Sequence, residues 1–281
     1  MTELELSAAI EALLVTRNPR GMQHARSALT PGYYFRAAGM LRAINGTVII
    51  ATGFPVTGTF ETDGPLGAIA LYRCLETLGA EPLLACGPPL ADSLQQDYRV
   101  MELHSRTLDE GRLEARQQLD ALQPAAIVAI ERPGLAADGR YYNMRGEDIS
   151  ARCFCFDAFM LEADCPTIAI GDGGNEIGMG NIQEAIVELQ VRTSVTRCDE
   201  LLVADVSNWG AYGLIAFLGL WNKRDLLAEL QPVKVLHYLS QRGAVDGVTR
   251  ENTLTEDGLE ARVGLHVIRE LQALVKDCRP D

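Results

Sequence analysis

Short, wholly apolar segments recur along the chain, and each is followed by a glycine-, proline- or aspartate-containing loop and then by a segment of helical periodicity. The apolar segments predict strands that are buried on both faces. These strands are expected at Thr47–Ala51, Pro82–Cys86, Ala125–Ile130, Thr167–Ile170 and Leu201–Asp205. Helices are expected near 64–79, 108–122, 155–163, 176–190 and 209–221. This alternation predicts βαβ units and a mostly parallel sheet with helices on both faces.

Further helical segments flank the predicted sheet at both ends of the chain. Helices are expected near 4–16 and 31–43, and a closing helix near 256–276. No repeat or low-complexity linker divides the sequence, so we expect a single Rossmann-like, three-layer α/β domain over residues 1–281. Its core would span residues 44–230, and residues 1–43 and 231–281 would be terminal helical additions.

Composition narrows the class of protein. The chain is 47% hydrophobic, which is enough for a large core, and its formal net charge of −13 argues against nucleic acid or an anionic membrane as a partner. The first residues are acidic and lack the basic region of a signal peptide, and no apolar run reaches the roughly 20 residues of a membrane span. We therefore expect a cytoplasmic protein; the sequence leaves its oligomeric state open, a homo-oligomer included.

Cysteines and histidines do not suggest a zinc site. The seven cysteines lie mostly in apolar surroundings and are expected to be reduced core thiols. The four histidines are far apart in the sequence and form no spacing typical of metal ligands.

The segment Thr167–Gly180 is the strongest candidate for chemistry. A short apolar strand leads into a glycine-rich loop that carries Asp172, Asn175 and Glu176. Carboxylate and amide oxygens are ligands that suit Mg²⁺, Mn²⁺ or Ca²⁺, and the glycines at 173 and 174 let a ligand approach the main chain. The loop matches neither of the common phosphate-binding glycine motifs. The alternative is a tight strand-to-helix turn with an ordinary helix cap.

Carboxylates also follow other predicted strands. Asp63 precedes Gly64-Pro65 at the start of a predicted helix, where it is either a cap or a metal ligand. Ligands of open α/β sheets bind beyond the carboxyl ends of the strands, and carboxylates that converge there need a cation among them. The pattern leaves open whether Asp205, Asn208 or Asp246 joins this site.

A long loop from Glu131 to Gly146 carries three arginines in an otherwise acidic protein. The planar guanidinium suits bidentate recognition of carboxylate or phosphate, so the loop predicts a small anionic substrate. The alternative is that these arginines form exposed ion pairs with neighbouring acids. The candidates for substrate contact are Arg132, Arg140, Arg145, Asn143, Gly173 and Gly174.

Three segments together resemble a known family: Thr52-Gly-Phe-Pro with Glu61 to Ala68, Glu131-Arg-Pro-Gly to Gly146, and Gly171 to Gly180. The chain resembles the D-glutamate cyclase-like C-terminal domain family over most of its length. The resemblance implies an α/β fold and the conversion of D-glutamate to 5-oxo-D-proline with loss of water.

The candidate residues suit this reaction. A carboxylate becomes electrophilic only when its charge is neutralised, and Asp63, Asp172, Asn175 and Glu176 are the predicted ligands of a Mg²⁺ or Mn²⁺ ion that would do so. Arg132 or Arg145 would bind the α-carboxylate, and Glu131 would accept the proton of the amine. The predicted catalytic residues are Glu131, Asp172 and Glu176.

Two other functions use the same residue types. A metal-dependent phosphohydrolase would bind its metal with the acidic loops and a phosphate with the arginines. A non-catalytic module would bind a metal or a metabolite without turnover.

Overall fold

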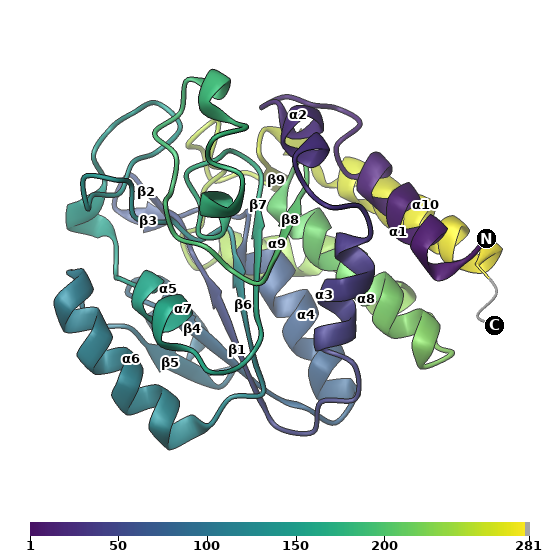
Figure 1. Cartoon of the computed structure of the whole chain (residues 1–281), viewed down its shortest axis with the longest axis horizontal. Helices are drawn as coiled ribbons and strands as arrows, with labels where there is room; N and C mark the ends of the chain where they lie inside the picture. The colour runs from purple at the N-terminus through teal and green to yellow at the C-terminus, as the bar shows by residue number, and fades with distance from the viewer. Residues whose placement is uncertain (279–281) are drawn as a thin grey trace.

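A computed structural model of the chain describes residues 1–278 and confirms the α/β architecture. Within these residues, six parallel strands form one sheet in the order β5-β4-β1-β6-β7-β8 (Figure 1). The strands are β1 (Thr47–Thr52), β4 (Glu81–Cys86), β5 (Val100–Glu102), β6 (Ala126–Ile130), β7 (Thr167–Gly171) and β8 (Glu200–Val203). Every residue of β1, β6 and β7 is buried, as expected of strands that helices cover on both faces.

Helices form layers on the two faces of this sheet (Figure 1). One face carries α3 (Tyr33–Met40), α4 (Pro65–Thr77) and α8 (Ser207–Trp221), and α8 packs against both of the others. The other face carries α6 (Leu108–Leu122) and α7 (Asp157–Glu162). The terminal helices α1 (Glu3–Leu13) and α10 (Ala261–Asp277) contact each other and cover α3 and α8. Within residues 1–278, no helix is long and apolar enough to cross a membrane.

Smaller elements complete the fold. The short helices are α2 (Met22–Ser27), α5 (Leu90–Leu94) and α9 (Pro232–Ser240), and the 3-10 turns are η1 (Ser150–Arg152), η2 (Met179–Asn181), η3 (Val187–Leu189) and η4 (Leu226–Glu229). Two hairpins are formed by β2 (Pro55–Val56) with β3 (Thr59–Phe60), and by β9 (Thr255–Glu256) with β10 (Leu259–Glu260).

The prediction of a helix over 176–190 is wrong, because this segment holds only the turns η2 and η3. Gly178 has a positive φ of 95°, and a Cβ atom there would lie 2.4 Å from the Cβ of Ala169. The backbone therefore packs directly against the sheet, which a regular helix with side chains cannot do. The closing helix is also shorter than predicted, since residues 255–260 form the β9–β10 hairpin, whose turn is Asp257-Gly258.

The strand order places a topological switch point between β1 and β6. From β1 the chain proceeds through β4 to β5 at one edge, and then crosses back to β6 on the other side of β1. Loops that leave these two strands at their carboxyl ends run in opposite directions, which opens a crevice between them. Ligands of open α/β sheets bind in this crevice, and so the functional site is expected here.

Helices α4 and α8 approach closely at Gly67, where an added Cβ would lie 2.8 Å from the Cα of Asn208. We expect Gly67→Ala to destabilise the protein by about 1–3 kcal/mol, because the helices must separate. Gly39→Ala is the matched control, since nothing lies within 4 Å of a Cβ added at this exposed position of α3. It is expected to be neutral or stabilising by up to about 1 kcal/mol. Urea unfolding measures the free energy of unfolding of both variants. Equal values for Gly67→Ala and Gly39→Ala would contradict the packing argument.

Candidate active site

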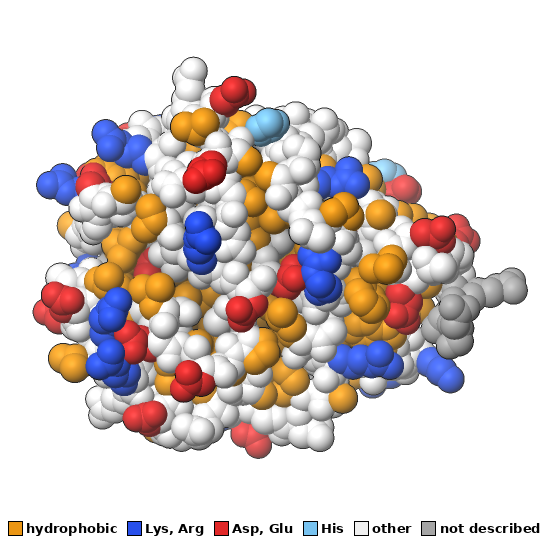
Figure 2. All heavy atoms as spheres, in the orientation of Figure 1, with side chains coloured by type: hydrophobic (Ala, Val, Ile, Leu, Met, Phe, Trp, Pro, Cys, Tyr) orange, Lys and Arg blue, Asp and Glu red, His pale blue; other side chains and the backbone are white. Residues whose placement is uncertain are grey.

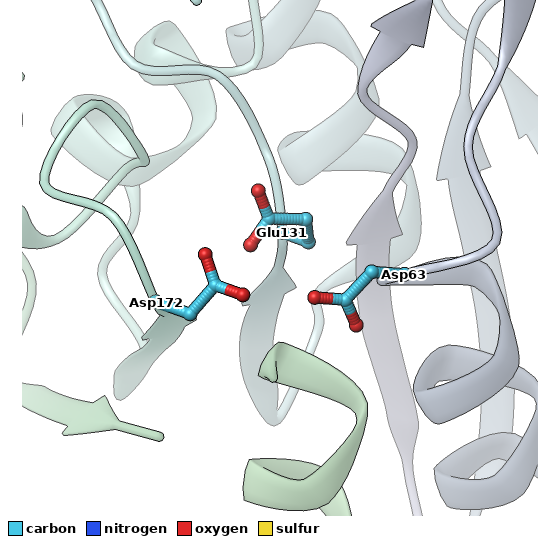
Figure 3. A group of neighbouring side chains, drawn as sticks. All are labelled: Asp63, Glu131 and Asp172. Carbon is cyan, nitrogen blue, oxygen red and sulfur yellow. The ribbon is translucent and has the colours of Figure 1, made fainter. Parts of the chain in front are cut away.

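Three buried carboxylates meet at the switch point (Figure 3). Asp63, Glu131 and Asp172 each place a carboxylate oxygen within 4.8 Å of the others. Asp63 follows β1 and its hairpin, whereas Glu131 and Asp172 directly follow β6 and β7. Three ionised carboxylates in a buried site repel one another, so the arrangement requires protons or a cation among them.

Asp63 is held at the amino end of α8. Its carboxylate accepts hydrogen bonds from the backbone N–H groups of Ser207 (2.9 Å) and Asn208 (2.8 Å), and from that of Gly64 (2.9 Å). These donors and the positive end of the helix dipole favour the charged form. Burial and the charge of Asp257 outweigh them and raise the pKa of Asp63 to about 7.

Glu131 occupies a strained backbone position, with a positive φ of 44° that non-glycine residues rarely adopt. The turn aims its carboxylate at the crevice, where Oε2 accepts a hydrogen bond from the Ser207 hydroxyl at 2.6 Å. Burial and the neighbouring charges of Asp172 and Glu176 raise the pKa of Glu131 well above its usual range.

Asp172 is paired with a cation that the sequence did not predict. Arg20, from the loop between α1 and α2, forms ion pairs with Asp172 and with Asp257, the latter at 2.7 Å. Asp257 lies in the β9–β10 turn, so Arg20 joins two chain segments to the end of β7. Burial raises the pKa of Asp172 to about 8 although Arg20 opposes the shift. The second oxygen of Asp172, Oδ2, accepts from no N–H group of the described residues, but a hydrogen bond with the protonated Asp257 carboxyl group lowers the pKa of Asp172 and raises that of Asp257.

The remaining polar residues of the glycine-rich loop have different roles. Glu176 accepts hydrogen bonds from the backbone N–H groups of Asp172 (3.2 Å) and Gly174 (2.6 Å), so its carboxylate closes the loop. These hydrogen bonds favour a structural role for Glu176 over its predicted roles as a metal ligand and a catalytic residue. Asn175 donates from Nδ2 to the carbonyl of Tyr142 at 2.8 Å, and its buried Oδ1 has no partner within residues 1–278. That oxygen is available to a ligand.

The glycines of this loop bring it close to its neighbours. A Cβ atom at Gly173 would lie 2.6 Å from the sulfur of Met144, and Gly174 has a positive φ of 113°. Neither position accepts a side chain without movement, and at Gly173 the loop packs against Met144.

A cavity of about 220 Å³ opens beside the carboxylates, and we call it the acidic cavity. Its wall includes four acids: Glu61, Glu131, Glu147 and Asp257. Basic and amide groups also line it, namely Arg20, Asn143, Arg145, Arg152, Asn175 and Arg250. Burial and the charges of Asp257 and Asp63 raise the pKa of Glu61 well above its usual range. The cavity therefore presents both carboxyl and guanidinium groups to a ligand.

Two of the predicted substrate-binding arginines lie elsewhere. Arg140 forms an exposed ion pair with Asp148 at 3.3 Å, as in the alternative interpretation of this loop. Arg132 is 4% exposed and donates from its guanidinium to the backbone carbonyls of Gly53 (2.9 Å) and Phe154 (2.5 Å). Of the predicted substrate contacts, the structure thus places Asn143 and Arg145 in the wall of the acidic cavity, but not Arg132, Arg140, Gly173 or Gly174.

Three polar residues that the sequence left undecided support the site without lining the acidic cavity. Asp205 accepts hydrogen bonds from the N–H groups of Arg17 (2.7 Å) and Asn18 (3.0 Å), which fixes the loop that carries Arg20. Asn208 joins α8 to α4, because its side-chain oxygen accepts from the N–H of Gly67 at 2.7 Å. Asp246 accepts from the N–H of Gly258 at 2.7 Å, which positions the turn that carries Asp257.

The raised pKa values predict how the stability of the metal-free protein depends on pH. Both aspartates have ordinary values of 3.8, whereas the folded values are about 7 for Asp63 and about 8 for Asp172. The folded state therefore holds these protons more tightly, and their stabilising contribution is complete below about pH 4 and is lost as the pH rises to about 8. We expect the Tm to fall by about 10 °C or more between pH 5 and pH 8.5.

Thermal unfolding of the metal-stripped chain measures how the Tm depends on pH. Asp172→Asn should make this dependence weaker, because one of the two titrating groups is removed. A Tm that rises with pH over this interval in the wild-type chain would contradict the predicted protonation of the cluster.

Comparison with known proteins identifies the family. The family described as D-glutamate cyclase-like, C-terminal, matches residues 10–272. The human mitochondrial D-glutamate cyclase is 35% identical over 199 residues, a stretch that covers 61% of this chain and 32% of the human protein. The chain thus matches about a third of the length of this relative.

Similarity to solved structures is more distant. An exopolyphosphatase-related protein from Bacteroides fragilis aligns with 87% of this chain and 57% of its own length, at 12% identity and a TM-score of 0.44. A ligand-free aldohexose dehydrogenase from Thermoplasma acidophilum aligns with 84% of this chain and 88% of its own, at 12% identity and a TM-score of 0.27. Because the family match extends over residues 10–272, the chain belongs to the D-glutamate cyclase-like C-terminal family.

Proposed function

We propose that this protein cyclises D-glutamate to 5-oxo-D-proline with loss of water, assisted by a divalent cation. The observation that carries the proposal is the group of three buried carboxylates at the switch point, within 4.8 Å of one another. The family assignment and the 35% identity to a D-glutamate cyclase support the choice of reaction.

The donor set fits Mn²⁺ or Mg²⁺, and Ca²⁺ also takes oxygen ligands of this kind. Asp63 and Asp172 would hold the cation, with Glu131 beside them. A buried oxygen in the same loop, Oδ1 of Asn175, has no hydrogen-bond partner in the described part of the chain, as expected of a group that awaits a ligand. When bound, the cation would neutralise the substrate carboxylate and make its carbon more electrophilic.

The charge distribution of the acidic cavity suits a zwitterionic amino acid. Glu61 and Asp257 line the cavity and would attract the ammonium group. Arg145 and Arg250 also line it and would bind the α-carboxylate. Ring closure is intramolecular, so a cavity that holds the substrate in a folded conformation contributes to the rate through positioning.

The proton transfers suit Glu131. A bond forms between the amine nitrogen and the γ-carboxyl carbon, and one oxygen of that carboxyl leaves as water with two protons from the ammonium group. Glu131 lines the cavity and has a raised pKa, so it can accept a proton from the nitrogen and return it to the leaving oxygen. The hydroxyl of Ser207 holds its carboxylate in place.

Turnover of D-glutamate, L-glutamate and 5-oxo-D-proline by the metal-stripped chain, with and without added Mn²⁺ or Mg²⁺, tests the proposal. We expect cyclisation of the D isomer that depends on the metal. Absence of turnover despite tight metal binding would overturn the cyclase assignment and favour a phosphohydrolase or a non-catalytic binding module.

A further inference from the structure

A second cavity of about 220 Å³ lies next to the acidic cavity, and we call it the arginine cavity. The two cavities share Phe54, Pro55 and Arg152 in their walls, so they are neighbouring lobes. The arginine cavity extends over the carboxyl ends of β1 and β4, where Gly53 and Gly87 contribute to its wall. It therefore lies on the side of the sheet edge at which α/β proteins bind ligands.

The arginine cavity is cationic in an acidic protein. Arg106, Arg132 and Arg152 line it, and no acidic residue does so among the described residues. This differs from the exposed surface, where Lys and Arg side chains lie among Asp and Glu on the face shown in Figure 2. Many exposed arginines of this chain have acidic partners, such as Arg116 with Glu162. Three guanidinium groups around one cavity without a carboxylate favour an anion between them.

Arg132 gives independent evidence for a missing partner. It is 4% exposed, and its hydrogen bonds run only to backbone carbonyls within residues 1–278. Its Nε is buried and has no acceptor there. A buried cation without a counter-ion is costly, and an anion in the adjoining cavity would offset this cost.

The other two arginines have free donors toward the cavity. Arg152 lines both lobes, and its side chain forms neither a hydrogen bond nor an ion pair with any described residue. Arg106 is held in position because its guanidinium stacks on the ring of Phe154 at 4.3 Å and donates from Nη1 to the carbonyl of Ala151 at 2.6 Å. Its remaining N–H groups are available to an anion.

We propose that the arginine cavity is an anion subsite that binds a carboxylate or phosphate group of a ligand whose amine end lies in the acidic cavity. This rests on the proposed function and extends it: D-glutamate, with its α-carboxylate at Arg145 and Arg250, has no further anionic group, so the occupant would be a larger acidic derivative of that amino acid. Size agrees with the assignment: ligand pockets typically measure roughly 300–1,000 Å³, a range that the two lobes reach together but neither reaches alone.

Direct anion binding tests the subsite without relying on turnover. Inorganic phosphate and, separately, acetate are titrated by calorimetry into the full metal-stripped chain and into Arg106→Gln and Arg152→Gln, both at exposed positions. We expect at least one of the two anions to bind the wild-type chain, and each substitution to weaken that binding by about tenfold or more. Comparison of phosphate with acetate identifies the preferred group.

Two further variants locate the binding. Arg262→Gln, at an exposed arginine paired with Glu260, controls for the loss of one positive charge and should bind the anion like the wild-type chain. Arg250→Gln removes an arginine of the acidic cavity, so an anion that binds there instead of in the arginine cavity loses affinity in this variant and not in Arg106→Gln or Arg152→Gln. The proposal is overturned if neither anion binds, if Arg106→Gln and Arg152→Gln bind like the wild-type chain, or if Arg250→Gln alone loses binding. If the chain cyclises D-glutamate but binds neither anion, the subsite proposal is wrong and the proposed reaction still holds.

Discussion

Asp172→Asn is expected to reduce the cyclisation of D-glutamate by about 10³-fold or more at saturating Mn²⁺. Asparagine keeps the shape of the side chain but removes the negative charge that would hold the cation. It also removes one of the two carboxylate partners of Arg20. Product formation followed by NMR measures the loss.

Stability distinguishes this loss from unfolding. Asp172 is buried among other acids, and its pKa is raised to about 8, so the folded protein gains by losing its charge. The variant should therefore unfold at or above the wild-type Tm at pH 8. Asp120→Asn, on an exposed position of α6, is the matched control and should keep full activity. Turnover by Asp172→Asn within tenfold of the wild-type chain would place the reaction elsewhere.

Arg20→Gln is expected to destabilise the metal-free protein by about 3 kcal/mol at pH 8. Arg20 forms ion pairs with both Asp172 and Asp257. Its loss leaves these two carboxylates without a positively charged partner among the described residues. Burial raises the pKa values of both aspartates, that of Asp257 well above its usual range, so protonation replaces the lost charge at lower pH. The destabilisation should therefore be smaller at pH 5.

A divalent cation should restore much of this stability, since binding to the folded state alone contributes about 2.7 kcal/mol at a concentration of 100 times Kd. Urea unfolding at pH 5 and pH 8, with and without Mn²⁺, measures these effects. Arg262→Gln on α10 is the control of equal charge change and should shift the free energy of unfolding by less than about 0.5 kcal/mol. A loss that is equal at both pH values would show that Arg20 acts through packing instead of charge.

The position of the site can be predicted from local sequence because the same order of strand, loop and helix recurs along the chain. Apolar strands followed by polar loops indicate a parallel sheet, and such sheets gather the residues after each strand at one edge. Asp63, Glu131 and Asp172 all follow strands in this way, and the structure brings them together. Their pattern in the chain is therefore sufficient to place them near one another.

The partners of these residues cannot be predicted in the same way. Arg20 contacts Asp172 across 152 positions of sequence, from a loop that has no distinguishing pattern. Asp257-Gly258 is a turn signal for a hairpin, yet nothing local indicates which surface the turn meets. Arg132 follows Glu131 directly, but its side chain turns to the backbone of neighbouring loops instead of to the acidic cavity. Such contacts depend on tertiary packing.

Tertiary packing also explains the helix that does not form after Asp172. Apolar residues at Ile177, Ile182 and Ile186 give this segment a pattern compatible with a helix, and all three are buried. Gly178 and Gly180 instead bring the backbone against Ala169 and Val195. Contacts at this distance are available only to glycine, and sequence periodicity does not reveal them.

Binding of Mn²⁺ to the metal-stripped chain tests most directly whether the three carboxylates form a divalent-cation site. Calorimetry at pH 8 would compare the wild-type chain with Asp63→Asn, Glu131→Gln, Asp172→Asn and the control Asp120→Asn. We predict one Mn²⁺ site whose affinity falls by about 100-fold or more in each of the three cluster variants and is unchanged in the control. Wild-type affinity in all three cluster variants, or no binding by the wild-type chain, would contradict the assignment.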